Sequence, residues 1–344
     1  MSREPAKAPA PEQSESRRGH RAVVTPSAPS AQSRPTPGPI AVGPDEAPHI
    51  VDAVTEGGGT LGPMDDDTRG LVWLSHRSVD ELDRVLTEHP GIEWVQLPMA
   101  GVDMFAPVMK RYADQPRPLW TSAKGAYSEP VAEHALALTL ALLRVFPERT
   151  RATSWATEPK GISLYGLDVV IVGAGGIALE IMRLLEPFDA RITIVRRSAD
   201  PVDGADRTVP ASSLSEVLPT ADVVIVAAAM TSDTSKMFGA AEFEAMKSTA
   251  VLVNIARGGL VDTDALVAAL DAGAIWGAGL DVTDPEPLPD GHPLWMSDRA
   301  LITPHQADTP EMVAPLLAER IRHNVRALGG EGDFIGVVDP AAGY

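Results

Sequence analysis

The stretch Val169-Val-Ile-Val-Gly173-Ala-Gly175-Gly-Ile-Ala178 decides the fold of this chain. It reads as a short apolar strand, a glycine-rich turn and the start of a helix. In the pattern Gly-x-Gly-x-x-Ala, the first glycine allows a tight turn and the second lets a pyrophosphate approach the backbone, while the small last residue lets the helix pack closely on the strand. The helix N-terminus then presents N–H groups to the phosphates. The sequence therefore predicts a dinucleotide site at Gly173, Gly175, Gly176 and Ile177, with a purely structural turn as the alternative.

The next strand, expected over 191–196, ends in basic residues. An NAD site would place Asp or Glu about 20 residues past the glycines, where the carboxylate accepts a hydrogen bond from the ribose 2′-hydroxyl. Arg196 occupies that place here, followed by Arg197 and Ser198. Two guanidinium groups and a hydroxyl can bind a 2′-phosphate by charge-assisted hydrogen bonds. We therefore predict a preference for NADPH over NADH. The alternative is that both arginines are solvated charges at the end of a strand.

Strand-length apolar runs alternate with helical segments from residue 49 onward. Such runs fall at 49–54, 70–76, 92–98 and 118–123, and then at 168–173, 191–196, 221–228, 250–255, 275–281 and 301–303. Alternating strands and helices are typical of α/β proteins with parallel sheets. The pattern predicts two doubly wound domains of the Rossmann or flavodoxin type, with the glycine-rich turn in the second one.

The expected domain boundaries follow from this pattern. Residues 1–48 hold 10 of the 31 prolines and show almost no aliphatic periodicity, so they are predicted to form a disordered tail. Residues 49–128 and 309–344 would form a smaller domain, and residues 129–308 the dinucleotide-binding domain. The helix expected over 130–146 is apolar nearly all round, which predicts that it is buried or lies in an interface.

Composition excludes several classes of protein. Hydrophobic residues make up 44% of the 344, enough for a sizeable core, and the net charge of −18 argues against binding to nucleic acid or to an anionic membrane. There is no cysteine, which excludes disulfides, thiolate metal sites and cysteine nucleophiles. The histidines lack the spacing of a metal site, and no run of about 18 apolar residues is present. We therefore expect a soluble, cytoplasmic protein without a metal ion.

Polar side chains follow the last three strands of the second domain. They are Arg257, Glu286 and His305, one after each strand. Doubly wound sheets bind their ligands at this carboxyl edge. Singly, these residues could be a surface ion pair, a solvated acid and a turn residue. Together, beside a dinucleotide site, they predict a catalytic group.

The order and spacing of these motifs resemble the D-isomer-specific 2-hydroxyacid dehydrogenase family. The similarity rests on Gly173-x-Gly175-x-x-Ala178, Asn254-x-x-Arg257-Gly-Gly, Leu280-Asp281-Val-x-x-x-Glu286-Pro and Thr303-Pro-His305, and it extends to Ala100-Gly101-Val-Asp103 and Ala132-Glu133-His134. Together these motifs cover nearly all of residues 90–325. The resemblance implies two domains with the active site in the cleft between them.

The resemblance also implies a role for individual side chains. Arg257 would bind the carboxylate of a 2-oxo acid and polarise its carbonyl, His305 would act as general acid or base, and Glu286 would orient the imidazole and favour its charged form. The backbone of Met99, Ala100 and Gly101 would hold the substrate carboxylate. Further cofactor contacts would come from Ala228, Ile255, Ala256 and Asp281.

The function expected on this basis is hydride transfer between NADPH or NADH and a small 2-oxo acid such as glyoxylate or hydroxypyruvate. The resemblance further implies a homodimer paired through the nucleotide domains. A phosphoglycerate-type dehydrogenase is the second enzyme hypothesis, although the acidic net charge disfavours it. The alternative of a different class is a dinucleotide-sensing co-repressor that binds proteins and has no metabolic turnover, since such proteins keep the same Arg, Glu and His.

Overall fold

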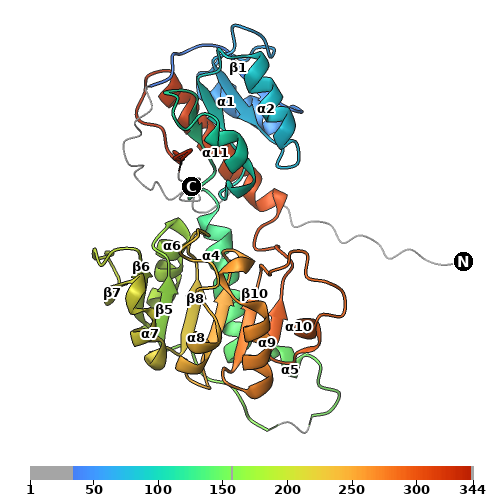
Figure 1. Cartoon of the computed structure of the whole chain (residues 1–344), viewed down its shortest axis with the longest axis vertical. Coiled ribbons are helices and arrows are strands. Elements are labelled where there is room, and N and C mark those ends of the chain that lie inside the picture. Colours follow the sequence, from blue (N-terminus) through green and yellow to red (C-terminus); the bar gives the residue numbers. More distant parts are fainter. Residues whose placement is uncertain (1–33, 156–157, 342–344) are drawn as a thin grey trace, which may run out of the picture.

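Two parallel sheets organise the chain into two lobes (Figure 1). The computed structural model describes residues 34–155 and 158–341. The smaller lobe is built on the strands between residues 40 and 121, and the larger lobe on those between 168 and 302. The predicted α/β class, with two parallel sheets and alternating helices, is confirmed.

The sheet of the smaller lobe has four parallel strands in the order β1-β2-β3-β4. They are β1 (Ile40–Gly43), β2 (Gly70–Trp73), β3 (Trp94–Gln96) and β4 (Leu119–Thr121). Successive residues of a strand point to opposite faces. Leu71 and Trp73 therefore enter one apolar core and Val72 the other, so both faces need helices to cover them.

Helices cover both faces of this sheet. On one side lie α1 (Pro48–Glu56) and α11 (Pro310–Leu328), and on the other α2 (Val79–Glu88) and α3 (Ala106–Lys110). Each fully buried leucine or isoleucine in these helices contributes about 1.5–3 kcal/mol relative to leaving it exposed. The smaller lobe thus draws one of its helices, α11, from the far end of the sequence.

The sheet of the larger lobe has seven parallel strands in the order β11-β10-β9-β8-β5-β6-β7. They are β5 (Asp168–Val172), β6 (Arg191–Arg196), β7 (Arg207–Pro210), β8 (Val223–Val226), β9 (Val251–Asn254), β10 (Gly277–Leu280) and β11 (Ala300–Ile302). The chain runs outward from β5 to β7 and then returns to β8 on the other side of β5. Such a reversal opens a ligand crevice at the carboxyl ends of the two central strands.

Helices also cover both faces of the larger sheet. One face packs against α4 (Ser128–Leu143) and α6 (Gly176–Leu185), and the other against α7 (Leu214–Val217), α8 (Ala240–Ala245), α9 (Thr263–Ala272) and α10 (Pro293–Met296). A short helix, α5 (Phe146–Arg149), follows α4. The helix predicted over 130–146 is therefore present, begins two residues earlier and packs one side on the sheet.

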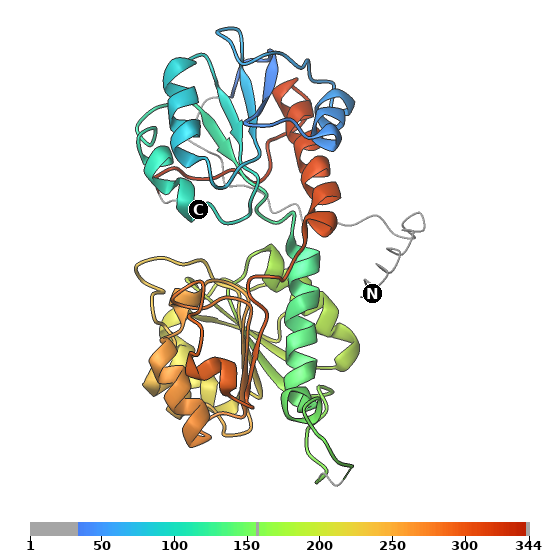
Figure 2. The same ribbon diagram turned by 90° about the vertical axis from the view of Figure 1, so that its right-hand side faces the viewer.

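Two segments of chain connect the lobes. One leads from β4 into α4, and the other from β11 into α11; Figure 2 shows α4 alongside the larger lobe and α11 rising into the smaller one. The C-terminal stretch returns to the smaller lobe, where the Ser122 N–H donates to the Gly336 carbonyl at 2.8 Å. Both connections leave the carboxyl end of a strand, so the connected edges of the two sheets face each other.

Two local expectations are wrong. Residues 49–54 form part of helix α1 and not a strand, because Pro48 begins the helix and Ile50, Ala53 and Val54 are buried at helical spacing. The first strand of the smaller lobe is β1, which lies inside the segment predicted as a tail. The predicted tail of residues 1–48 is therefore wrong over β1, which belongs to the folded sheet. Residues 1–33 lie outside the described residues.

Strand β7 of the larger sheet was not predicted from the sequence. β7 pairs in parallel with β6 at the edge of the sheet and ends in a proline. Proline and short length are tolerated at an edge, where one side of the strand has no partner, but they weaken the apolar pattern.

Among the described helices, none combines the length and the apolar character that crossing a membrane requires.

Candidate active site

The glycine-rich turn lies in the crevice between β5 and β8. Gly173 has φ +118°, and a Cβ atom there would lie 2.5 Å from the Ala227 carbonyl oxygen, so only glycine fits. Gly175 is the N-cap of α6, and the space where its Cβ would point is open for 4 Å. Gly176 and Ile177 form the first turn of α6 and supply its free N–H groups. The turn therefore fits a dinucleotide pyrophosphate, with backbone donors and no side chain in the way.

The basic residues at the end of β6 lie beside this turn. The Gly173 N–H donates to the carbonyl of Val195 at 2.7 Å, and Arg196 follows directly. Arg196 is half-buried, and its Nη1 donates to the Asp200 carbonyl at 3.4 Å. The Ser198 hydroxyl donates to the Asp200 carboxylate at 2.6 Å. The structure thus brings Arg196 and Ser198 together, and it adds a carboxylate that the sequence analysis did not include.

Other residues predicted to contact the cofactor line the same edge. Ala228 follows β8, and its backbone nitrogen lies 2.9 Å from where a Gly173 Cβ would be. Ile255 and Ala256 follow β9, where the Asn254 side chain accepts from the Ala256 N–H at 3.1 Å and donates to the Arg257 carbonyl at 2.9 Å. Asn254 therefore fixes the turn that carries Arg257.

Asp281 directly follows β10 and anchors the turn that carries His305. Its side chain is 2% exposed, and its Oδ1 accepts from the Thr303 hydroxyl and from the Gln306 N–H, both at 2.8 Å. Its carbonyl accepts the N–H of His305 at 2.7 Å. The His134 Nε2, from α4, lies 2.8 Å from the Thr303 hydroxyl oxygen. These bonds pin the turn at three points.

His305 and Glu286 are in direct contact. The His305 Nδ1 lies 2.6 Å from Glu286 Oε1, a short bond of the charge-assisted kind. His305 has φ +52°, which is uncommon for a residue other than glycine. The two side chains are 49% and 42% exposed, so the imidazole reaches open space. With Nδ1 committed to the carboxylate, Nε2 is the atom that can exchange a proton with a ligand.

Arg257, from the larger lobe, forms hydrogen bonds with Asp103 of the smaller lobe. Its Nε and Nη2 donate to Asp103 Oδ2 at 3.1 and 3.0 Å, and its Nη1 donates to the Ala256 carbonyl at 2.7 Å. A Cβ on Gly101 would lie 1.5 Å from Arg257 Nη2, so the guanidinium packs directly on Gly101 and a side chain there would have to displace it. The predicted substrate loop and the predicted cation therefore come together across the two lobes.

Two hydrogen bonds from the segment after β4 fix the loop of Met99, Ala100 and Gly101. The Met99 carbonyl accepts from the Ala123 N–H at 3.0 Å, and the Tyr127 hydroxyl donates to the Pro98 carbonyl at 2.5 Å. Within the described part of the chain, the N–H groups of Ala100 and Gly101 have no hydrogen-bond partner. Those two groups are available to an anion beside Arg257, whereas Met99 contributes backbone position only.

Three site residues were not predicted to act at the site. Asp103 and His134 stand in motifs that the sequence analysis quoted, which was the available signal, but their partners were not foreseeable. Asp308 gave no signal. Burial raises the pKa of the Asp308 carboxyl, the charge of His305 opposes that rise, and the charge of Asp281 adds to it. A second carboxyl therefore lies near the imidazole, on the connection to α11.

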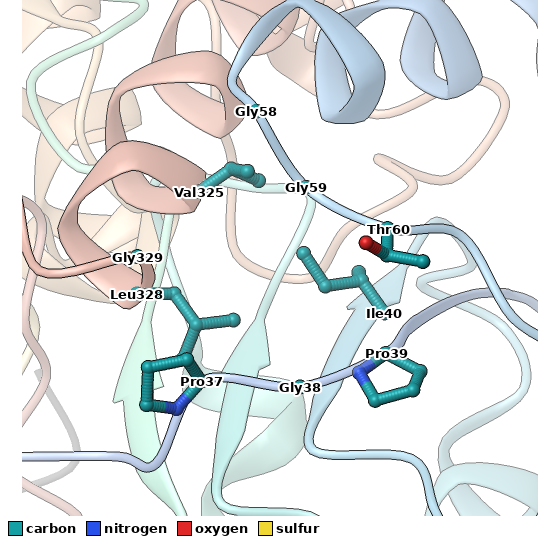
Figure 3. Close-up of a pocket in the computed structure, with 10 residues that line it drawn as sticks. All are labelled: Pro37, Gly38, Pro39, Ile40, Gly58, Gly59, Thr60, Val325, Leu328 and Gly329. Carbon is teal, nitrogen blue, oxygen red and sulfur yellow. The ribbon is translucent and has the colours of Figure 1, made fainter.

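A hollow of about 370 Å³ lies away from these residues, at the outer edge of β1 and the end of α11 (Figure 3). Its lining includes Pro37, Ile40, Val325 and Leu328 and none of the residues discussed above. No group of three or more His, Asp or Glu placed to hold a metal ion occurs within residues 34–155 and 158–341.

Comparison with known proteins agrees with this geometry. Residues 136–307 match the model of the D-isomer specific 2-hydroxyacid dehydrogenase family, NAD binding domain. An uncharacterized protein from the proB 3′ region of Corynebacterium melassecola is 37% identical over 305 residues, which cover 86% of this chain and 98% of that protein. The NAD binding domain contains the glycine-rich turn and Arg257, Glu286 and His305.

Two of the relatives with functional names are glyoxylate/hydroxypyruvate reductases. The human glyoxylate reductase/hydroxypyruvate reductase is 37% identical over 188 residues, or 52% of this chain, and the alignment spans just 57% of the human protein. A crystal structure of an NADPH-dependent glyoxylate/hydroxypyruvate reductase from Sinorhizobium meliloti has a TM-score of 0.70 at 26% identity, covering 88% of this chain and 98% of that one. The chain belongs to the D-isomer specific 2-hydroxyacid dehydrogenase family.

Proposed function

We propose that this chain reduces a small 2-oxo acid to the corresponding D-2-hydroxy acid with NADPH. The observation that carries the proposal is the 2.6 Å contact between His305 Nδ1 and Glu286, on the same sheet edge as the dinucleotide turn and Arg257. The human and Sinorhizobium meliloti relatives are reductases of glyoxylate and hydroxypyruvate, which makes these acids the first substrates to test. A protein-binding co-repressor finds no support among those relatives.

Each side chain has a defined task in this reaction. Arg257 and the N–H groups of Ala100 and Gly101 bind the substrate carboxylate, and the guanidinium polarises the carbonyl. Bound NADPH supplies the hydride that adds to the carbonyl carbon. His305 gives its Nε2 proton to the carbonyl oxygen, and Glu286 holds the ring in place through the contact with Nδ1. The products are the 2-hydroxy acid, NADP⁺ and a neutral His305, which regains its proton from solvent.

Replacement of His305 should slow turnover strongly without unfolding the chain. We expect His305→Ala to lower kcat for glyoxylate or hydroxypyruvate by about 10²- to 10⁴-fold, because a positioned general acid contributes that much. Glu286→Gln should lose less, since the amide can still orient the imidazole but carries no charge. NADPH consumption at 340 nm measures both. His49→Ala, on the exposed side of α1, is the matched control. Full activity in His305→Ala would contradict the assignment.

The coenzyme preference is proposed from the end of β6. Arg196 and Ser198 lie beside the dinucleotide turn and offer donors to a 2′-phosphate. The Asp200 carboxylate nearby opposes this, so the hydroxyl of Ser198 must turn from Asp200 to the phosphate. We infer that the guanidinium outweighs that cost, because a hydrogen bond to a charged group stabilises by about 1.5–3 kcal/mol.

Removing this cation should therefore change selectivity more than rate. We expect Arg196→Ala to lower kcat/KM for NADPH by about tenfold to a hundredfold and to leave kcat/KM for NADH nearly unchanged. Arg207→Ala, at the opposite end of the neighbouring strand, should change neither value. Equal kcat/KM values for the two coenzymes in the unaltered protein would overturn the preference.

We further propose a homodimer formed through α4 and the segment after it. The outer side of α4 leaves Leu136, Ala137, Leu140 and Ala141 partly or fully exposed. Farther along, Phe146, Trp155 and Tyr165 are 53%, 101% and 62% exposed. Apolar surface of this extent on one side of a lobe marks an interaction site. A cytoplasmic location stays a prediction of the sequence.

The dimer is tested by the size of the particle in solution. Sedimentation equilibrium at micromolar concentration should give about twice the 36.4 kDa chain mass. Leu140→Asp should shift the mass to that of one chain, because it places a charge in an apolar interface. Ala241→Asp, at an exposed position of α8 on the opposite face of the sheet, is the control and should leave the mass unchanged. A monomer in the unaltered protein would refute the proposal.

A further inference from the structure

The guanidinium of Arg257 is already shared with a carboxylate of the chain itself. An arginine has five N–H donors. Three of them are engaged, two by Asp103 Oδ2 and one by the Ala256 carbonyl, which leaves two for a ligand. The cation that would bind an anionic substrate therefore has an anionic neighbour on the opposite lobe.

More acid groups surround this position. The turn of Arg257 packs directly on the loop after β10, where a Cβ on Gly258 would lie 1.9 Å from the Thr283 carbonyl oxygen. The Asp284 carboxylate in that loop comes within 3.8 Å of where a Gly259 Cβ would be. Glu286 follows two residues later and contacts His305. Asp103 is thus the carboxylate in contact with Arg257, and Asp284 and Glu286 add negative charge on the neighbouring loop of the larger lobe.

We propose that Asp103 is a specificity-determining residue that makes the cleft selective for 2-oxo acids with a single negative charge. The inference rests on the proposed function, in which Arg257 binds the substrate carboxylate. One carboxylate of a ligand can take the two free donors of Arg257. A second negative charge on the same small ligand would be attracted less, because Asp103 already neutralises part of the charge of Arg257. It would also lie a few ångströms from the Asp103 carboxylate and be repelled by it.

The size of the effect follows from the exposure of the pair. Arg257 and Asp103 are 36% and 55% exposed, so their surroundings screen charge almost as water does. Two like charges about 4 Å apart in water repel enough to weaken binding about fivefold. The same repulsion falls with added salt, because exposed charges are screened over about 10 Å at 0.1 M. Asp103 should therefore select by charge, moderately and in a salt-dependent way.

Oxamate and oxalate test this selectivity without any turnover. The two ions have nearly the same shape, but oxamate carries one negative charge and oxalate two at neutral pH. Their dissociation constants are measured by calorimetry on the NADPH-loaded protein at low ionic strength. The comparison is made for the unaltered chain, Asp103→Asn, Asp103→Glu and Asp52→Asn. Asp103→Glu keeps the charge, and Asp52→Asn removes one acid from the exposed surface of α1.

We expect the unaltered chain to bind oxamate more tightly than oxalate. Asp103→Asn should improve oxalate binding about fivefold more than oxamate binding, whereas Asp103→Glu and Asp52→Asn should keep the original ratio. The difference should shrink in 0.5 M salt. If both ions bind and Asp103→Asn leaves their ratio unchanged, the selectivity role is overturned and the proposed function stands. If neither ion binds the loaded protein, the proposed function itself fails.

Discussion

The buried carboxylate of Asp281 is the constraint on which the site depends. It directly follows β10, the second strand from the edge of the larger sheet, and accepts bonds from Thr303 and Gln306, while its carbonyl accepts the N–H of His305. These bonds hold His305 in an uncommon backbone conformation and aim its imidazole at Glu286. Holding a residue there costs of order 1–3 kcal/mol, which the surrounding bonds must offset. These bonds thus fix the position of the His305 imidazole, the group that we propose as proton donor.

The two lobes divide the work of the site. The larger lobe presents the dinucleotide turn, Arg257 and the His305–Glu286 pair at one edge of its sheet. The smaller lobe brings a backbone loop whose Gly101 packs on Arg257 and whose Asp103 pairs with it. The proposed acid and the loop proposed to bind the substrate therefore come from different lobes, and Arg257 pairs with Asp103 where the lobes meet.

The site residues that could be predicted from the sequence are those that stand in a short local pattern. A tight glycine turn and single polar residues after apolar runs can be read along the chain, and these placed Gly173, Arg257 and His305 on one sheet edge. The helix α1 was mistaken for a strand because six apolar-rich residues fit both periods. The pairing of Arg257 with Asp103 joins residues 154 positions apart, and that of His134 with Thr303 joins residues 169 apart. Such distances depend on how two lobes sit together, which no spacing in the sequence contains.

The central claim is that a hydride passes from NADPH to one face of a 2-oxo acid while the chain supplies the proton. The most direct measurement follows a deuterium label from the C4 position of NADPH into hydroxypyruvate, using each of the two C4-labelled isomers in turn. One isomer should deliver its deuterium to C2 of the product, which should be D-glycerate by chiral chromatography and mass spectrometry. Product of the L configuration, or no deuterium at C2 with either isomer while NADPH is consumed, would contradict this account.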